Sequence, residues 1–358
     1  MKNRYPMLLS GIVALTLTAS AFAAADSHPD LTGTYDVSTL TPLQRPEEFG
    51  NNLELTPAQA SAIVEENRLR SLAADENRGP VTKAPPTGGA APIGADDSFR
   101  ENLGAGNVGG YNNFWIDRGS DVFMVDGKFR TSIITDPENG RMPSMTPAAT
   151  QRVMERRKLR RPNDGTAWWL EVAGPGPYDG PEMLGISERC ILGFTGSTPT
   201  FPSLYNNFKR IVQTEDHVMI LLEMVHDARI VRMNSEHLPA DATMWLGDSI
   251  GWWEGDTLVV DTTNFHPLSR PGRVGSVGAH VVERFTKLDD GNLNYRFTVE
   301  DPTVWTEPWS GEYIWRVSDD RLYEYACHEG NYAMEGILKG ARLLESEARE
   351  NAITSNDD

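Results

Sequence analysis

One heptapeptide concentrates ionisable side chains inside an otherwise apolar stretch of the chain. It runs from Glu223 to Arg229 and has the sequence EMVHDAR. On a β-strand, Glu223, Asp227 and Arg229 share one face and His226 lies on the other, because side chains alternate. If the shared face lines a barrel interior, its two carboxylates and guanidinium can orient a polar substrate or perform acid–base chemistry. The alternative is a solvated strand face with internal salt bridges.

A second candidate group lies near the C-terminus, in the run YEYACHEGNY from residue 323 to residue 332. Glu324 and His328 share one face if a strand persists that far, and Tyr325 is near both. Residues at the end of a strand often carry function, and these three side chains could supply a general acid and a general base. The alternative is a disulfide anchor beside a capped strand end.

His280 and Glu283 form a third candidate group, although three-residue spacing puts them on opposite faces of a regular strand. The spacing differs from the helical His-Glu-x-x-His zinc motif, in which both histidines share one helix face. The sequence contains no compact metal-ligand motif, so we expect no metal, while a zinc site assembled from distant residues stays open. It also contains no Gly-x-Ser-x-Gly elbow, dinucleotide-binding loop or Walker loop. We therefore expect neither Ser/His/Asp catalysis nor a cofactor.

Aromatic residues give a separate signal between residues 245 and 315, a span that holds six tryptophans. The pair Trp252-Trp253 places one ring on each face of its strand, so at least one ring should face a core or a pocket. Tryptophans beside polar groups suit a pocket for a sugar or an aromatic ring. The alternative is that these rings are ordinary core.

The N-terminus predicts export. Lys2 and Arg4 precede an apolar run over residues 7–18, and Ala21-Phe22-Ala23 forms a small-x-small cleavage site. The apolar run is shorter than the roughly 20 residues that span a bilayer, and no later stretch qualifies. We expect a signal peptide over residues 1–23, cleavage near Ala23, and a periplasmic or secreted mature protein.

The only two cysteines are Cys190 and Cys327. In an oxidising compartment two lone cysteines generally pair, so we expect a disulfide between them. It would close a loop of over a hundred residues and stabilise the fold by about 4–5 kcal/mol in the chain-entropy model. The alternative is a catalytic thiol, since Cys327 precedes His328. Neighbours on a strand point to opposite faces, which argues against a thiolate–imidazole pair.

The charge balance restricts the partners. The chain has 33 basic and 51 acidic residues and a formal net charge of −18. Such a field repels phosphate backbones and anionic lipids, so we expect no nucleic-acid partner and no membrane partner or span. A small-molecule ligand is the remaining expectation, and no prediction of oligomeric state follows.

The chain divides into an N-terminal arm over residues 24–110 and a larger domain over residues 111–345. In the arm we expect a strand over residues 30–40 and a helix over residues 56–76 that begins with the capping sequence Thr-Pro-Ala-Gln. Residues 79–110 are rich in Pro, Gly and Ala, which is typical of a flexible linker or a long surface loop.

The larger domain is mainly β. A hairpin is expected over residues 122–135, turning at Asp126-Gly127, and a second helix begins at Thr146. The later expected strands are 209–214, 217–224, 226–233, 244–253, 257–265, 281–288, 293–300, 313–317 and 321–326. Closely spaced turns between such strands predict an antiparallel meander, which hides its edges by closing into a barrel. A last helix over about 333–347 and a disordered tail over residues 346–358 complete the prediction.

Two short strings recur at similar offsets. Thr-Pro-Ala occurs at residues 56 and 146, and Tyr-Asn-Asn-Phe occurs at residues 111 and 205. A true repeat would mean two similar units packed together. The alternative is chance combined with common capping chemistry.

Residues 111–342, about two thirds of the chain, resemble a family of exported bacterial proteins that usually carry no functional name. The resemblance rests on ERCI, EMVHDARI, WEGDTLVV, VERF, FTVEDP and YACHEGN. It implies export and brings no activity. A weaker likeness to lipocalin-like barrels rests on Gly33-Thr34-Tyr35, without the tryptophan of that motif, and implies only the fold.

The sequence therefore predicts an exported β-barrel that binds a small molecule, either a sugar or an aromatic or apolar compound. The alternative is a cofactor-free acid–base enzyme, such as a lyase, isomerase or hydrolase, and a structural or scaffold role is a third hypothesis. The candidate catalytic residues are His226, Glu223, Asp227, His328, Glu324 and Tyr325. The candidate ligand-binding residues are Trp252, Trp253, Arg229, His280 and Glu283.

Overall fold

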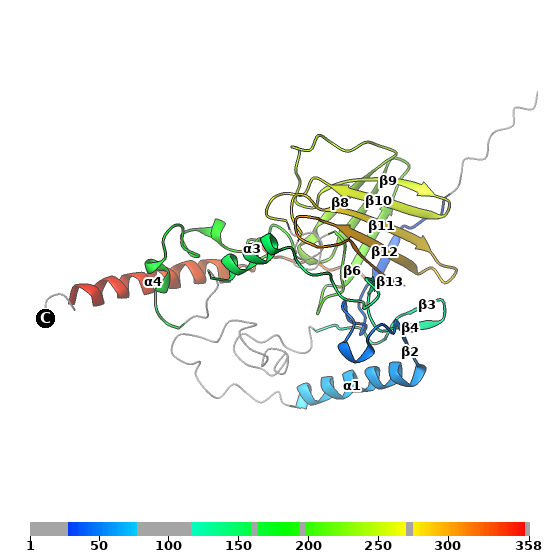
Figure 1. Cartoon of the computed structure of the whole chain (residues 1–358), viewed down its shortest axis with the longest axis horizontal. Coiled ribbons are helices and arrows are strands. Elements are labelled where there is room, and N and C mark those ends of the chain that lie inside the picture. The colour runs from blue at the N-terminus through cyan, green and yellow to red at the C-terminus, as the bar shows by residue number, and fades with distance from the viewer. Residues whose placement is uncertain (1–27, 77–115, 159–163, 194–197, 270–274, 355–358) are drawn as a thin grey trace, which may run out of the picture.

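The computed structural model describes residues 28–76, 116–158, 164–193, 198–269 and 275–354. The predicted signal peptide, the predicted linker and the first Tyr-Asn-Asn-Phe string lie outside these residues. The described chain forms a β-barrel with the helices α1 (Pro57–Glu76), α3 (Pro147–Lys158) and α4 (Tyr332–Thr354) beside it (Figure 1).

Nine strands form the barrel, and each is hydrogen-bonded to the next around a closed ring. They are β1 (Gly33–Asp36), β6 (Phe208–Gln213), β7 (His217–Leu222), β8 (Ala228–Met233), β9 (Asp248–Glu254), β10 (Thr257–Thr263), β11 (His280–Lys287), β12 (Leu293–Glu300) and β13 (Trp309–Ser318). The pairing of β13 with β1 closes the ring. The predicted barrel is therefore confirmed.

The prediction of a purely antiparallel meander is wrong at one place, because β8 and β9 run parallel, with Val231 opposite Ser249. The expected strand from residue 244 in fact begins at Asp248. Parallel neighbours need a crossover connection rather than a tight turn. Residues 234–247 supply it by returning from the end of β8 to the barrel end at which β8 began.

The barrel draws its closing strand from the range that we assigned to the N-terminal arm. Thr34 of β1 lies opposite Arg210 of β6 on one side and opposite Ser318 of β13 on the other. Without β1, both β6 and β13 would present an unpaired edge, which natural sheets avoid. The arm therefore contributes to the barrel as well as preceding it.

The two barrel ends differ in their connections. At one end, which we call the turn end, three short turns over residues 214–216, 255–256 and 288–292 join consecutive strands. At the other, the loop end, lie the tight turn over residues 223–227 and the longer connections around residues 198–207, 264–279 and 301–308. Functional groups usually lie on the longer loops of such a scaffold.

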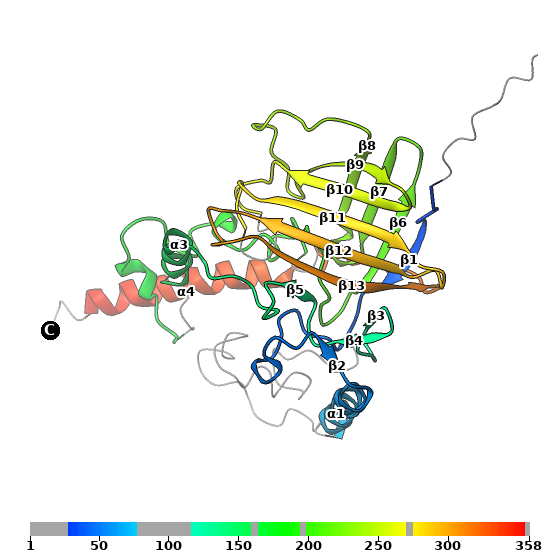
Figure 2. The same cartoon turned by 45° about the vertical axis from the view of Figure 1, so that its right-hand side comes forward.

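The expected strand over residues 321–326 is wrong, since this segment has no regular secondary structure. The preceding strand, β13, is longer than predicted and pairs with β12 along most of its length. On its other side it pairs with β5 (Ile134–Asp136) near its start and with β1 near its end (Figure 2). Both edges of β13 are therefore occupied, and no hydrogen-bonding edge is left for a following strand.

The predicted helix starts are confirmed. The Thr56 hydroxyl accepts a hydrogen bond from the Gln59 backbone N–H (3.3 Å), and the Gln59 side chain accepts one from the Thr56 N–H (2.9 Å), which is a capping box. Thr146 caps α3 through the Ala149 N–H (3.2 Å). The disordered tail is wrong for residues 346–354, because α4 continues to Thr354. The helix packs on Trp169, whose indole N–H donates to Glu345 Oε1 (2.9 Å).

A small second sheet lies beside the barrel in the order β2 (Glu54–Leu55), β4 (Lys128–Arg130) and β3 (Met124–Val125). The predicted turn at Asp126-Gly127 joins β3 to β4, and both of its residues have positive φ, as such hairpin turns require. Helix α1 packs on this sheet through Ala60. The described residues also contain the short 3₁₀ segments η1 (Glu47–Phe49), η3 (Trp168–Glu171) and η4 (Pro181–Met183) and the kinked segment η5 (Met224–His226).

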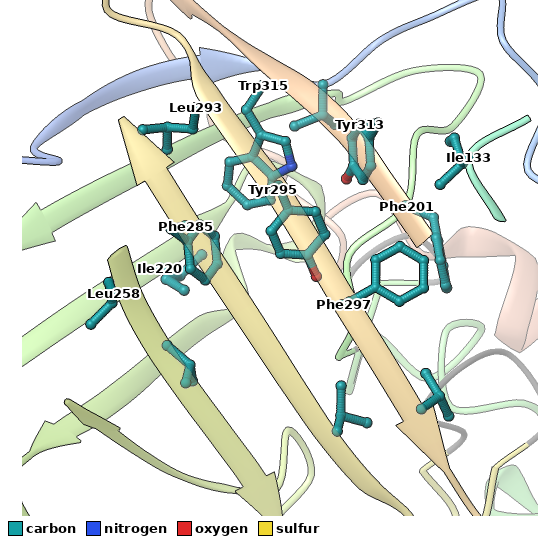
Figure 3. Packing of buried hydrophobic residues seen from close by; sticks show 14 of the residues in the cluster. Ile133, Phe201, Ile220, Leu258, Phe285, Leu293, Tyr295, Phe297, Tyr313 and Trp315 are labelled. Atoms are coloured by element: carbon teal, nitrogen blue, oxygen red, sulfur yellow. The ribbon is translucent and has the colours of Figure 1, made fainter. Parts of the chain in front are cut away.

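The barrel interior is a packed aromatic core (Figure 3). Six rings, each at most 2% exposed, point inward: Phe285, Tyr295, Phe297, Trp309, Tyr313 and Trp315. The chain also sends Phe201 into the loop end, where its ring lies 5.5 Å from that of Phe297 and 6.2 Å from that of Trp309. This part of the tryptophan-rich region is therefore core.

Candidate functional site

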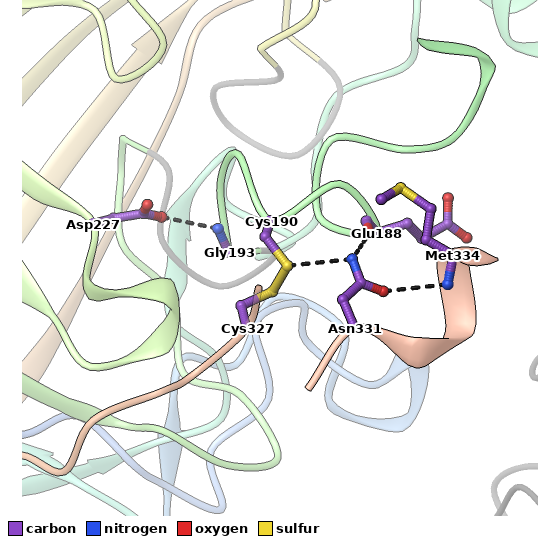
Figure 4. The surroundings of a disulfide bond; sticks show 7 residues. All are labelled: Glu188, Cys190, Gly193, Asp227, Cys327, Asn331 and Met334. Atoms are coloured by element: carbon purple, nitrogen blue, oxygen red, sulfur yellow. Dashed lines mark hydrogen bonds between the residues drawn. A yellow bond between two sulfur atoms is a disulfide. The ribbon is translucent and has the colours of Figure 1, made fainter. Parts of the chain in front are cut away.

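Cys190 and Cys327 form a disulfide with their α-carbons 5.7 Å apart, which confirms the predicted pairing. Both cysteines of the chain are used in this bond, so the catalytic-thiol alternative is wrong. The bond attaches the C-terminal segment around residue 327 to the loop over residues 188–193 (Figure 4).

The same loop contacts the turn between β7 and β8. The Gly193 backbone N–H donates a hydrogen bond to Asp227 Oδ2 (2.9 Å), and Asn331 donates through its side-chain amide to the Glu188 carbonyl (2.8 Å; Figure 4). The first and second candidate groups, one hundred residues apart in the sequence, therefore meet at the loop end. We call Lys209, Glu223, His226 and Asp227, together with the disulfide, the loop-end site.

The backbone of the turn between β7 and β8 adopts an unusual conformation. Val225 has φ 58° and ψ 13°, and His226 has φ 44°, so two successive residues are left-handed. A β-branched residue rarely adopts this conformation, which costs an L-residue about 1–2 kcal/mol. Asn206 and Cys190, at φ 55° and 57°, belong to the surrounding loops. In the described chain, four of the seven non-glycine residues with positive φ therefore surround one site, and such strain clusters at functional sites.

Lys209 is the residue of this site that the sequence analysis missed. It lies on β6, is 0% exposed, and donates from Nζ to the Asn206 carbonyl (3.1 Å). Burial lowers the pKa of Lys209 to about 8, against the opposing effect of Glu223, Asp227 and Asp36. The sequence did contain a signal for it: Lys209 lies two residues before Ile211, so the lysine shares the apolar face of its strand.

Asp227 and Glu223 place two carboxyl groups beside Lys209. Burial raises the pKa of Asp227 to about 6, although the Gly193 N–H, His226 and Lys209 all favour its charged form. Glu223 is buried as well and accepts from the Phe208 N–H (3.4 Å). His226 is exposed, but residues 223–227 form the turn between β7 and β8, so the strand alternation predicted for Glu223, Asp227 and Arg229 is wrong. The alternative of a fully solvated face is wrong for both carboxyl groups.

Arg229 and Glu283, predicted to bind a ligand, pair with each other inside the barrel. Arg229 Nη2 lies 2.9 Å from Glu283 Oε1, and Nη1 contacts the second carboxylate oxygen. Tyr295 donates its hydroxyl to the same carboxylate (2.6 Å). Arg229 is 4% and Glu283 0% exposed, so this ion pair belongs to the core.

The other predicted ligand-binding residues lie away from the loop-end site. His280 lies on the outer barrel face, where Nε2 is 2.8 Å from Asp261 Oδ2, so His280 and Glu283 do occupy opposite faces. Trp252 donates to Glu254 (3.1 Å) next to the turn end. Trp253 packs on the core and stacks on His28, with ring centroids 4.7 Å apart. The predicted set is therefore dispersed over the barrel.

Glu324, Tyr325 and His328 lie on the segment that the disulfide attaches to the loop end. The segment is not a strand, so the predicted shared face of Glu324 and His328 does not exist. Both of these side chains are exposed, and Tyr325 is half-buried. The segment stays beside the first candidate group through the disulfide at Cys327, the Asn331 contact with Glu188, and the Tyr323 N–H, which donates to Glu223 Oε1 (3.5 Å).

The described residues offer neither a metal-binding cluster nor a helix that could cross a membrane. They contain no group of three or more His, Cys, Asp or Glu side chains arranged to hold a metal ion. None of the described helices combines the length and the hydropathy that a membrane crossing requires. Comparisons with protein-family models and with curated proteins found no match.

Proposed function

We propose that the protein is an exported β-barrel protein that binds a small polar molecule at the loop-end site. The observation that carries this proposal is the coincidence of left-handed backbone at Val225 and His226 with buried ionisable groups at Lys209 and Asp227. A fold retains such unfavourable features where a site depends on them. The disulfide between Cys190 and Cys327 fits the oxidising compartment that the predicted signal peptide implies.

The barrel lumen is a poorer site than the loop end. The inward rings of Tyr295, Tyr313, Trp309 and Trp315 are each fully buried, and Phe201 packs on Trp309 from the loop end. A ligand in the lumen would have to displace this core. Lipocalin-like binding inside the barrel is therefore not the mode that we propose.

The chemistry of the loop-end site favours a sugar over an apolar compound. The carboxyl groups of Glu223 and Asp227 accept hydrogen bonds from hydroxyl groups, and the protonated form of Asp227 also donates. The imidazole rings of His226 and His328 are exposed and add polar contacts at the edge of the site. A hydroxyl-rich ligand can satisfy these groups, whereas a hydrocarbon would leave them unpaired.

Acid–base catalysis at the same site is a second candidate function. It is favoured by the pKa of Asp227 at about 6 and that of Lys209 at about 8, on either side of neutral pH. Groups with pKa values near the working pH are the most effective proton donors and acceptors. The enzyme would then exchange protons with the bound molecule through Asp227.

Thermal-shift screening of the purified protein with sugars and with aromatic acids tests the binding proposal. A sugar should raise the Tm of the wild type and of the control Asp289→Asn, an exposed change at the turn end, but not that of Asp227→Asn or Lys209→Met. A sugar-induced shift that survives in both loop-end variants would refute the proposed site.

Turnover assays with the ligand found by the screen separate the two functions. Acid–base catalysis predicts that Asp227→Asn loses turnover even at ligand concentrations high enough to restore the Tm shift. The matched control is Asp289→Asn, an exposed change in the turn over residues 288–292 at the turn end. Equal turnover in Asp227→Asn and the wild type excludes Asp227 as a catalytic residue, whereas absence of turnover in the wild type leaves binding as the function.

A further inference from the structure

The crossover that makes β8 and β9 parallel is attached to the outer barrel wall through His237. Its Nδ1 lies 3.0 Å from Asp248 Oδ2, and its Nε2 lies 3.0 Å from Asp261 Oδ1. The two carboxylates come from different strands, β9 and β10. One imidazole therefore joins the connection over residues 234–247 to two strands at once.

His237 lies in a row of alternating charges across five strands. Arg232 of β8 donates to Asp248 (2.8 Å), and His280 of β11 lies 2.8 Å from Asp261 Oδ2. Glu300 of β12 follows, 3.7 Å from His280 Nδ1. The hydrogen bond to Asp261 is the main cause that raises the pKa of His280, and the bonds from His280 and His237 help to lower that of Asp261.

Backbone contacts hold the same segment independently of any imidazole. The Leu238 N–H donates to Asp248 Oδ2 (2.8 Å), and Arg232 also donates to the Glu236 carbonyl (3.0 Å). These bonds persist at any pH at which Asp248 is ionised. Loss of a His237 contact should therefore loosen the crossover without unfolding the barrel.

The number of protons on an imidazole decides how many carboxylates it can bind. An imidazolium donates from both ring nitrogens, whereas a neutral imidazole donates from one and presents a lone pair at the other. In the neutral form one of the two carboxylates would face that lone pair. Imidazole is also the side chain that ordinarily changes charge between pH 5 and 8.

We propose that His237 is a pH-sensitive latch that holds residues 234–247 on the barrel wall when doubly protonated and loosens them when neutral. The crossover reaches the loop end, because the Thr198 hydroxyl donates a hydrogen bond to the Leu246 carbonyl (3.4 Å). Thr198 lies two residues before Thr200, in the segment that enters the barrel at this end. Loosening therefore extends toward the segment that covers the core. The proposal is independent of the proposed ligand and of acid–base catalysis.

Hydrogen exchange of the purified protein at pH 5.5 and pH 8.0, corrected for intrinsic rates, tests the latch. Amides of residues 236–247 should exchange about five-fold more slowly at pH 5.5, the effect of roughly one hydrogen bond. Strand β12 serves as an internal reference for the change in global stability that Asp227 causes, and the slowing of residues 236–247 is measured relative to it. The exposed control His217→Gln should behave as the wild type, and His237→Gln should show no pH effect in this segment.

Two results would overturn the proposal. One is a crossover whose corrected exchange in the wild type is the same at both pH values, a result that needs no variant to fold. The other is a pH effect on residues 236–247 that persists in His237→Gln. In that case another group of the charge row, with His280 the first candidate, controls the segment.

Discussion

Lys209 and Asp227 lie within electrostatic reach of each other at the loop end, and burial moves their pKa values toward neutrality from opposite sides. The pKa of Asp227 rises to about 6 and that of Lys209 falls to about 8. Each group lowers the cost of charging the other, yet burial outweighs this attraction for both. A pair of this kind costs free energy of folding, which is a reason to expect that it has a function.

The first prediction concerns the pH dependence of stability. Because the pKa of Asp227 is raised on folding, the folded state binds the proton more tightly, so stability falls as pH rises from about 4 to about 6. The loss approaches about 3 kcal/mol, from roughly two pKa units at 1.36 kcal/mol each. Asp227→Asn should remove this part of the pH profile, as urea unfolding at pH 4 and pH 7 would measure. Parallel profiles for the variant and the wild type would contradict the raised pKa.

The second prediction concerns the buried ion pair of Arg229 and Glu283. Removal of one partner leaves an uncompensated buried charge, so Arg229→Met or Glu283→Gln should each cost about 3–5 kcal/mol. The double variant Arg229→Met/Glu283→Gln should cost less than the sum of the single changes, because no charge is left unpaired. Denaturant unfolding of the four proteins measures this coupling. Additive costs would show that the pair does not act as a unit.

The third prediction concerns the backbone at Val225. Val225→Gly removes a buried side chain but also relieves the left-handed conformation, which is unstrained for glycine. The control Val218→Gly removes a buried valine side chain from a regular strand and adds the flexibility of glycine. We expect Val225→Gly to cost at least about 2 kcal/mol less than Val218→Gly. Equal losses in urea unfolding would mean that Val225 is not strained.

The fourth prediction concerns the disulfide, whose cysteines are 137 residues apart. The chain-entropy model gives a stabilisation of about 5 kcal/mol for a loop of this length. The double variant Cys190→Ser/Cys327→Ser should lose most of this stability and should also exchange amide hydrogens faster over residues 323–331. A loss under about 1 kcal/mol would indicate that contacts such as Asn331 with Glu188 hold the segment without the covalent bond.

The barrel could be predicted because its strands alternate clearly, as in Val218, Ile220 and Leu222 on β7. Two features carried no such signal. β1 has only four residues, and its role in closure depends on pairing with strands over 170 residues away. The parallel register of β8 and β9 depends on where residues 234–247 run, which no local pattern specifies.

The candidate site was predicted only in part, because some of its contacts leave no local signal in the sequence. The heptapeptide around Asp227 stands out by composition, and the pairing of Cys190 with Cys327 follows from their number. The contact that joins them uses the backbone N–H of Gly193, which has no side-chain signature. His328 and Glu324 were placed on a strand that β13 excludes by using both of its edges.

The coupling between Lys209 and Asp227 is tested most directly by NMR titration of the Asp227 carboxyl carbon in the wild type and in Lys209→Met. We predict a pKa of about 6 in the wild type, and a higher value in the variant because the neighbouring ammonium no longer favours the carboxylate. A wild-type pKa near the ordinary value of about 4, unchanged in Lys209→Met, would contradict the coupling between Lys209 and Asp227.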